Sequence, residues 1–80
     1  MKPNELSAAK SVLIFKTNIK HQNDVDVVTP LLNQTQGIHQ WNVATDDVDK
    51  VLRIETFQLQ AHEIINLINN ASYHCEEFLY

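Results

Sequence analysis

Residues 11–20, SVLIFKTNIK, decide the fold of this chain. The run Val12-Leu13-Ile14-Phe15 combines β-branched and aromatic residues, and the segment then becomes polar. A short apolar run of this composition is typical of a largely buried strand. We therefore expect these residues to form the central strand of a sheet.

The length and composition of the chain predict one compact domain. Eighty residues can build a single hydrophobic core, and 44% of them are hydrophobic while only one is glycine. The first ten residues are polar and show no clear period. We expect residues 1–10 to be a tail and residues 11–80 to be the domain.

A helix is expected after the first strand, over residues 24–36. Apolar residues recur there at helical spacing, namely Val25, Val28, Leu31 and Leu32. Either Asn23 or Asp24 could cap its first turn.

Pro30 lies inside this helix and leaves two alternatives open. Inside a helix, proline removes one hydrogen bond and clashes with the preceding turn. The helix is therefore either kinked and continuous from Asp24, or short, with Thr29 as its cap and Pro30 in its first turn. The spacing of the valines favours the kinked helix.

Two strands are expected after Gly37, the only glycine, which stands where a left-handed residue would end the helix. Residues 38–43 predict a strand with an irregular start. Residues 51–55 predict another strand, with Leu52 and Ile54 on one face. The connection between these strands is short, so they should form an antiparallel pair.

A second helix and a last strand complete the chain. The helix is indicated by an apolar stripe that ends near Ser72, and the stripe consists of Ile64, Ile65, Leu67, Ile68 and Ala71. Residues 73–78 then predict a short strand. Alternation places Cys75 on one face of that strand and His74 and Glu76 on the other.

The predicted order of elements is strand, helix, strand, strand, helix, strand. This is the split βαβ arrangement of a ferredoxin-like βαββαβ sandwich, an α+β fold. Right-handed crossovers should place both helices on one face of a four-stranded antiparallel sheet.

Across nearly its whole length the chain resembles the heavy-metal-associated domain family, which includes metallochaperones. A hydrophobic first strand leads through a polar loop to a helix with Val28 and Leu32 at the family's core spacing. Residues 38–43 and 52–54 resemble the family's second and third strands. Residues 71–73, Ala-Ser-Tyr, resemble its Ala-Gly-Tyr step out of the second helix.

The family holds a soft ion such as Cu(I) with a Met-x-Cys-x-x-Cys motif in the loop after the first strand. The resemblance places this motif on residues 19–24. Ile19 then stands for the methionine, and His21 and Asp24 stand for the two cysteines. Both thiolates are absent, and imidazole and carboxylate suit borderline or harder ions.

His21 and Asp24 nevertheless belong to a candidate metal site. The last strand of the predicted sheet begins beside the end of the first, which brings Tyr73 and His74 to the same edge. The metal hypothesis is therefore a divalent transition ion held by His21, Asp24 and His74. The favoured alternative is that Asp24 caps the helix, that both histidines are solvated, and that no cofactor is bound.

Three other features have ordinary structural interpretations. Cys75 is a lone thiol, more typical of a small buried hydrophobe than of a metal ligand. Trp41 is expected in the core, whereas exposure on the open face of the sheet would make it an anchor for a partner. Residues 46–49 carry three aspartates without the spacing of an EF-hand, and we expect a solvated turn.

Composition disfavours several functional classes. The net charge is −4 and the six lysines and arginines are scattered, so we expect no nucleic-acid binding. No apolar run approaches the roughly 20 residues of a membrane span, and no signal-peptide pattern is present. One cysteine suits a reducing compartment, so we expect a cytoplasmic protein. No catalytic motif is recognisable, and we expect no enzyme.

Two functions follow from this sequence. The favoured one is a metal-free interaction domain that binds a protein partner, or a second copy of itself, through the exposed sheet face or an edge strand. The alternative is a metal-binding or metal-transfer protein whose altered site consists of His21 and Asp24, with His74 as a further ligand.

Overall fold

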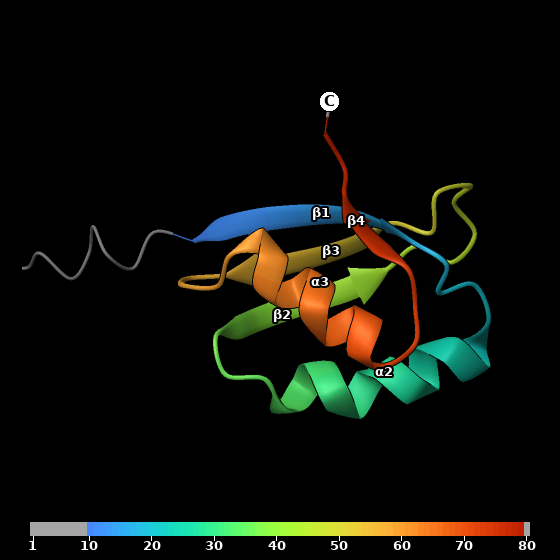
Figure 1. Cartoon of the computed structure of the whole chain (residues 1–80), viewed down its shortest axis with the longest axis horizontal. Helices are drawn as coiled ribbons and strands as arrows, with labels where there is room; N and C mark the ends of the chain where they lie inside the picture. Colours follow the sequence, from blue (N-terminus) through green and yellow to red (C-terminus); the bar gives the residue numbers. More distant parts are fainter. Residues whose placement is uncertain (1–9, 80) are drawn as a thin grey trace, which may run out of the picture.

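The structure is a computed structural model that describes residues 10–79. The expected tail, apart from Lys10, lies outside the described residues. The elements follow one another in the predicted order (Figure 1). They are β1 (Ser11–Thr17), α2 (Gln22–Gln34), β2 (Ile38–Val43), β3 (Leu52–Thr56), α3 (Ala61–Asn70) and β4 (Cys75–Glu77).

The four strands form one sheet in the order β2-β3-β1-β4, and every neighbouring pair is antiparallel. β1 is therefore central, as expected, whereas β2 and β4 lie at the edges. Buried residues of α2 and α3 join buried residues of the sheet in one cluster, so both helices cover the same face. The predicted ferredoxin-like βαββαβ sandwich is confirmed.

The core lies between this face of the sheet and the two helices. Alternate residues of β1 and β3 point into it, because successive side chains of a strand point to opposite faces. Burying one large apolar side chain contributes roughly 1.5–3 kcal/mol, so this cluster is the main source of stability. Its members are Phe15, Ile19, Val28, Leu32, Leu52, Ile54, Ile64, Ile68 and Cys75.

β1 ends at Thr17, three residues before the end of the segment that predicted it. The Thr17 hydroxyl donates to the carbonyl oxygen of Lys50 (2.6 Å) and accepts from the backbone N–H of Ile19 (3.1 Å). Ile19 is fully buried. Residues 18–20 therefore form a loop whose middle residue is anchored in the core.

α2 continues through Pro30, so the continuous helix is confirmed and the short helix capped by Thr29 is wrong. The Thr29 hydroxyl donates to the carbonyl oxygen of Val25 (2.7 Å). Hydrogen bonds of this kind keep a threonine inside a helix and often bend it. Within residues 10–79, no helix has the length and the apolar character needed to cross a bilayer.

α2 begins at Gln22, and His21 occupies the N-cap position with an extended backbone. The expectation that Asn23 or Asp24 is the N-cap is therefore wrong. Asp24 lies one turn further in, at the third helical position, and its carboxylate still accepts from the backbone N–H of His21 (3.0 Å). It thus satisfies a free N–H at the helix start from inside the first turn.

The connection from α2 to β2 depends on Gly37. Its φ is +100°, and a Cβ atom there would lie 2.9 Å from Cγ of Leu59. Both observations require a residue without a side chain. The register of β2 then shifts between Ile38 and Gln40, which confirms the irregular start of this strand.

The last strand is shorter than predicted. β4 covers Cys75–Glu77, whereas residues 73–78 were expected to be extended. At its beginning, the backbone N–H of His74 donates to the side chain of Asn18 (2.8 Å) and not to a strand neighbour. The alternation holds, because Cys75 is buried while His74 and Glu76 are exposed.

Candidate functional site

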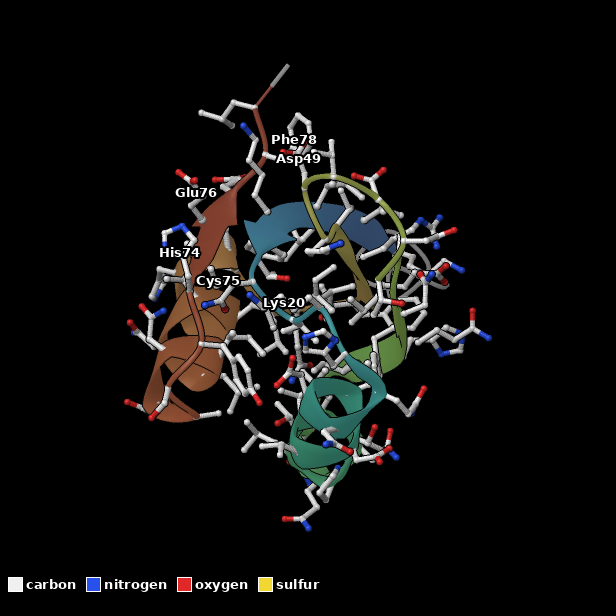
Figure 2. The ribbon with its side chains drawn as sticks, turned by 90° about the vertical axis from the view of Figure 1, so that its right-hand side faces the viewer. Lys20, Asp49, His74, Cys75, Glu76 and Phe78 are labelled. Carbon is white, nitrogen blue, oxygen red and sulfur yellow. The ribbon has the colours of Figure 1, made fainter. Side chains whose placement is uncertain are left out.

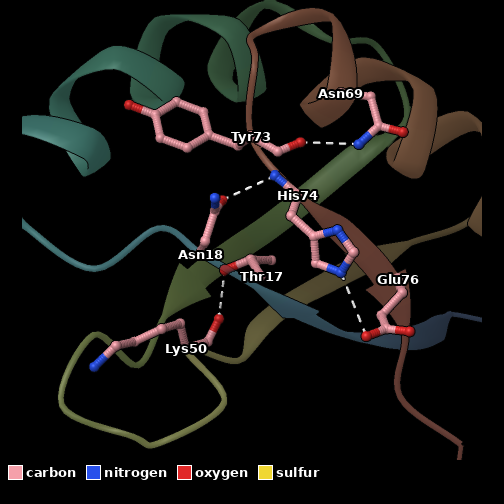
Figure 3. A network of polar contacts seen from close by, with 7 residues as sticks. All are labelled: Thr17, Asn18, Lys50, Asn69, Tyr73, His74 and Glu76. Atoms are coloured by element: carbon pink, nitrogen blue, oxygen red, sulfur yellow. Dashed lines mark hydrogen bonds and ion pairs between the residues drawn. The ribbon is translucent and has the colours of Figure 1, made fainter.

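Three connections meet at one end of the molecule, which we call the loop end: residues 18–21, 44–51 and 71–74. The backbone N–H of Thr17 donates to the carbonyl oxygen of Asp49 (3.1 Å), which holds the second connection against the end of β1. The backbone N–H of His74 donates to Oδ1 of Asn18 (2.8 Å), which holds the third connection against the first. Figure 2 looks onto this end, and Figure 3 shows part of its polar network.

Asp24 lies in the first turn of α2, beside residues 18–21 of the loop end, and accepts three hydrogen bonds. Its Oδ2 accepts from the backbone N–H groups of Lys20 (3.2 Å) and His21 (3.0 Å). Its Oδ1 accepts from the Tyr73 hydroxyl (2.8 Å). The bond from His21, followed by the bond from Tyr73, holds the pKa of Asp24 below its ordinary value of 3.8.

Tyr73 joins two distant parts of the chain. Its hydroxyl bonds to Asp24, 49 residues away, and so ties the α3–β4 connection to the first turn of α2. The hydrogen bond to the Asp24 carboxylate raises the pKa of Tyr73, because it favours the protonated phenol. Sheet geometry predicted that Tyr73 lies at this edge, but no local signal in the sequence indicates its bond to Asp24.

The two candidate histidines have different surroundings. The side chain of His21 is exposed beside the start of α2. The imidazole Nε2 of His74 lies 3.3 Å from Oε2 of Glu76, and both side chains are more than half exposed (Figure 3). In this view the imidazole is directed along β4 towards Glu76 and not towards the loop that contains Asn18.

The structure brings Asp24 to Tyr73, and His74 to Glu76. Among residues 10–79, no three or more histidine, cysteine, aspartate or glutamate side chains are grouped so that they could hold a metal ion. The proposed ligands His21, Asp24 and His74 are therefore not arranged as a closed site. Whether they take up an ion is a question for a binding measurement, and the metal site stays a prediction.

Cys75 has the only thiol of the chain, and it is 5% exposed in the core. It lies in β4 opposite Thr17 of β1, on the face covered by the helices. Burial, with a smaller effect from the charge of Glu76, raises the pKa of Cys75 to about 12. The thiolate form, which binds soft metals, is therefore strongly disfavoured.

The aspartates of the β2–β3 connection form a turn. Oδ1 of Asp47 accepts from the backbone N–H of Asp49 (2.7 Å), and the ammonium group of Lys50 donates to the carbonyl oxygen of Thr45 (2.8 Å). Lys50 has a φ of +48°. These local bonds agree with the expected solvated turn.

Trp41 is neither a core residue nor an exposed anchor. It is half-buried at the border of the core, on the helix side of β2. Its indole N–H donates to Oδ1 of Asn33 in α2 (2.9 Å). The sequence predicted burial of the ring but gave no indication of this partner.

The open face of the sheet, away from the helices, carries an ion-pair cluster that sequence reasoning missed. Glu55 is only 8% exposed there, because Lys10 (3.1 Å) and Arg53 (2.5 Å) both contact its carboxylate. These bonds, that of Arg53 first, lower the pKa of Glu55. Nearby, the ring of His39 meets that of Phe57 edge-on at 5.5 Å between centroids.

Comparison with known proteins gives structural relatives only. No protein-family model matches the sequence, and no curated protein matches it. The apo form of the heavy-metal-associated domain of a copper chaperone for superoxide dismutase has a TM-score of 0.75 and 20% identity. That match covers 89% of this chain and 69% of the relative.

Two further solved structures agree with this match. The copper(I)-loaded first domain of the human copper chaperone for SOD1 has a TM-score of 0.74 and 20% identity, over 86% of this chain and 93% of the relative. Oxidized MerP from Ralstonia metallidurans CH34 has a TM-score of 0.75 and 8% identity, over 89% of this chain and 100% of the relative. The chain has the fold of the heavy-metal-associated domains.

Proposed function

We propose that this chain is a non-enzymatic, cytoplasmic interaction module that uses the heavy-metal-associated fold without a thiolate metal site. One observation carries the proposal: at the loop end, the carboxylate of Asp24 is engaged on both oxygens by Lys20, His21 and Tyr73. A group that closes a structural network in this way is poorly suited to bind and release a cargo ion.

The donor set supports the same conclusion. Cu(I) selects thiolate and thioether ligands, and the loop of residues 18–21 contains neither. The single thiol, Cys75, lies in the core with a raised pKa. Metal transfer between proteins by thiolate exchange therefore has no group on this chain to perform it.

The proposal of a protein partner has separate support. A copper chaperone for superoxide dismutase, one of the structural relatives, is named for the protein that it serves. In this chain the open face of the sheet carries Val12, which is 44% exposed, beside Glu55 and its cationic partners. Protein interfaces combine an apolar core with a polar rim, and this face offers both kinds of group.

Metal content tests this function directly. The chain is produced without a histidine tag, passed over a desalting column, and analysed by mass spectrometry for copper, zinc and nickel. We expect well below one ion per chain for each metal, because residues 10–79 contain no preformed donor set that would retain one. A stoichiometric amount of any of them would overturn the proposal.

A second candidate is an altered site for a divalent ion. His21 and His74 belong to connections of the loop end and Asp24 to the adjoining first turn of α2, and imidazole with carboxylate suits divalent ions. An ion would have to displace Tyr73 and two backbone N–H groups from Asp24. Calorimetric titration with Zn²⁺, Ni²⁺ and Cu²⁺ distinguishes this candidate from the metal-free module. Binding heat that is seen with the wild-type chain and lost in His21→Ala/His74→Ala supports the site. Equal heat from the wild type and the variant excludes it.

A further inference from the structure

β2 has an outer side with no neighbouring strand among residues 10–79. The backbone N–H of Ala44, just after this strand, donates to the carbonyl oxygen of Val51 on the side of β3 (2.9 Å). Bonded and non-bonded pairs alternate along an antiparallel ladder. After the bulge, the even-numbered residues of β2 therefore bond inwards to β3, and the main-chain groups of Trp41 and Val43 point outwards.

Apart from the bulge at its start, this edge lacks the features by which proteins prevent strand addition. Natural edge strands are kept short, or carry charges or proline. The other edge strand, β4, has three residues, and two of them are Glu76 and Glu77. In contrast, β2 continues for four residues after its bulge, Gln40 to Val43, with no proline and no charged side chain. Of the two edges, only β2 is open to pairing.

The surface around this edge is also hollowed. A depression of about 470 Å³ is lined by residues 39–42, by Asn33 of α2, and by Arg53 and Glu55 of β3. Three of its seven lining residues are amides, and its two charged residues already pair with one another. An incoming strand therefore meets hydrogen-bonding groups without an unpaired charge.

We propose that β2 pairs with β2 of a second copy of this chain, as antiparallel strands related by a two-fold axis at Trp41. This inference rests on the proposed interaction function and names the partner. The two four-stranded sheets then join into one continuous sheet, and the outward main-chain groups of Trp41 are satisfied in both copies.

The ends of the free segment limit the register. The bulge between Ile38 and Gln40 limits pairing at one end, and the chain turns away after Ala44 at the other, where the N–H of Asp47 donates to its carbonyl oxygen (3.1 Å). Centring the pair on Trp41 places the outward main-chain groups of this residue opposite those of its copy, so residues 40–42 of both strands pair regularly. Val43 then lies opposite His39, at the bulge, where regular pairing ends.

This register is self-complementary. Gln40 of one copy lies opposite Asn42 of the other, on the open face, in a pair without main-chain bonds, where side chains approach closely. Amide side chains can donate to and accept from one another. On the helix side, the two half-buried Trp41 rings come together and cover one another's exposed parts.

Charge substitutions at the paired amides test both the pairing and its register. Gln40→Lys/Asn42→Lys places lysine opposite lysine, while Gln40→Lys/Asn42→Glu places lysine opposite glutamate twice. Both positions are exposed, so the fold should tolerate them. The control is Asn66→Lys/Asn70→Lys, which makes the same charge change at exposed positions of α3.

The measurement is sedimentation equilibrium of metal-free chains at concentrations up to about 1 mM, a range that detects weak association. We expect the wild-type mass to rise from 9.2 kDa towards twice that value, and the control to follow it. The double-lysine variant should associate at least about tenfold more weakly. The lysine–glutamate variant should regain or exceed wild-type association.

The inference is overturned if the wild-type chain stays monomeric, if the double-lysine variant associates like the control, or if the lysine–glutamate variant does not recover. Fluorescence of the single tryptophan gives a second readout, because pairing removes water from Trp41. In the wild type, the tryptophan emission should shift to shorter wavelength over the same range of protein concentration in which the mass rises. A monomeric chain without metal overturns β2 pairing alone, whereas stoichiometric metal overturns the proposed function.

Discussion

Asp24 links the start of α2 to the connection before β4 with one carboxylate. The sequence offered Asp24 as one of two N-cap candidates, whereas His21 is the N-cap and Asp24 accepts from its backbone N–H out of the third helical position. The bond to Tyr73 could not be predicted, because it joins residues 49 positions apart that only the folded chain brings together. A local pattern can predict that Asp24 lies at the helix start, but not its tertiary partner.

The lowered pKa of Asp24 predicts a pH dependence of stability. Because its folded-state pKa lies below the unfolded value near 3.8, the ionised carboxylate stabilises the fold above that pH. This contribution is lost as the pH falls through the folded-state pKa. Urea unfolding at pH 7, 5, 4 and 3 should show a smaller loss of stability on acidification for Asp24→Asn than for the wild type.

Asp26→Asn provides the control for this prediction. Asp26 is an exposed residue of the same helix, and its carboxylate accepts from the side chain of Gln22 (2.9 Å). The control should keep the wild-type dependence on pH. If Asp24→Asn and Asp26→Asn lose the same stability between pH 5 and pH 3, the network around Asp24 does not have the role described above.

At the scale of elements, α2 shows how a helix can contain a proline. Pro30 cannot donate to the carbonyl oxygen of Asp26, one turn earlier. Both residues are exposed, so water can bond to the carbonyl group that the proline leaves free. Apolar spacing predicted the continuous helix, because Val28 and Leu32 on either side of the proline are both fully buried.

Replacing Pro30 should stabilise α2. Pro30→Ala restores the missing hydrogen bond, while the unfolded chain gains some freedom that opposes the effect. The net increase in the free energy of unfolding should be about 1–2 kcal/mol. Urea unfolding at pH 7 measures it, with Gln34→Ala, an exposed residue of the same helix, as the control.

A decrease in stability for Pro30→Ala, with Gln34→Ala unchanged, would contradict this account of α2. It would show that the ring of Pro30 makes a contact that outweighs the missing hydrogen bond.

The ends of β1 and β4 show the limit of prediction at this scale. Both strands are shorter than their sequence patterns, because Thr17 bonds to Lys50 and His74 bonds to Asn18.

At the scale of the whole molecule, the fold was predictable and the candidate site was not. Apolar periodicity fixes which face of each element enters the core, and two helices with four strands in this order have few ways to pack. Relatives with 20% and 8% identity share the fold, because a core demands apolar residues of suitable volume and few particular ones. A site demands particular groups at particular distances, which periodicity does not specify.

The proposed function holds that this chain has the fold of the heavy-metal-associated domains without a thiolate site for Cu(I). His21 and Asp24 are the residues at which the resemblance places the family's two cysteines. If the loop end is otherwise intact, His21→Cys/Asp24→Cys should create a site, although it also removes the Asp24 network. This variant is therefore the positive control for the wild type.

The most direct measurement is competition for Cu(I) with a coloured chelator under reducing conditions, without oxygen and without a histidine tag. The wild-type chain should leave the absorbance of the copper chelate unchanged, whereas His21→Cys/Asp24→Cys should withdraw about one copper ion per chain. Withdrawal of one equivalent by the wild-type chain itself would contradict the account.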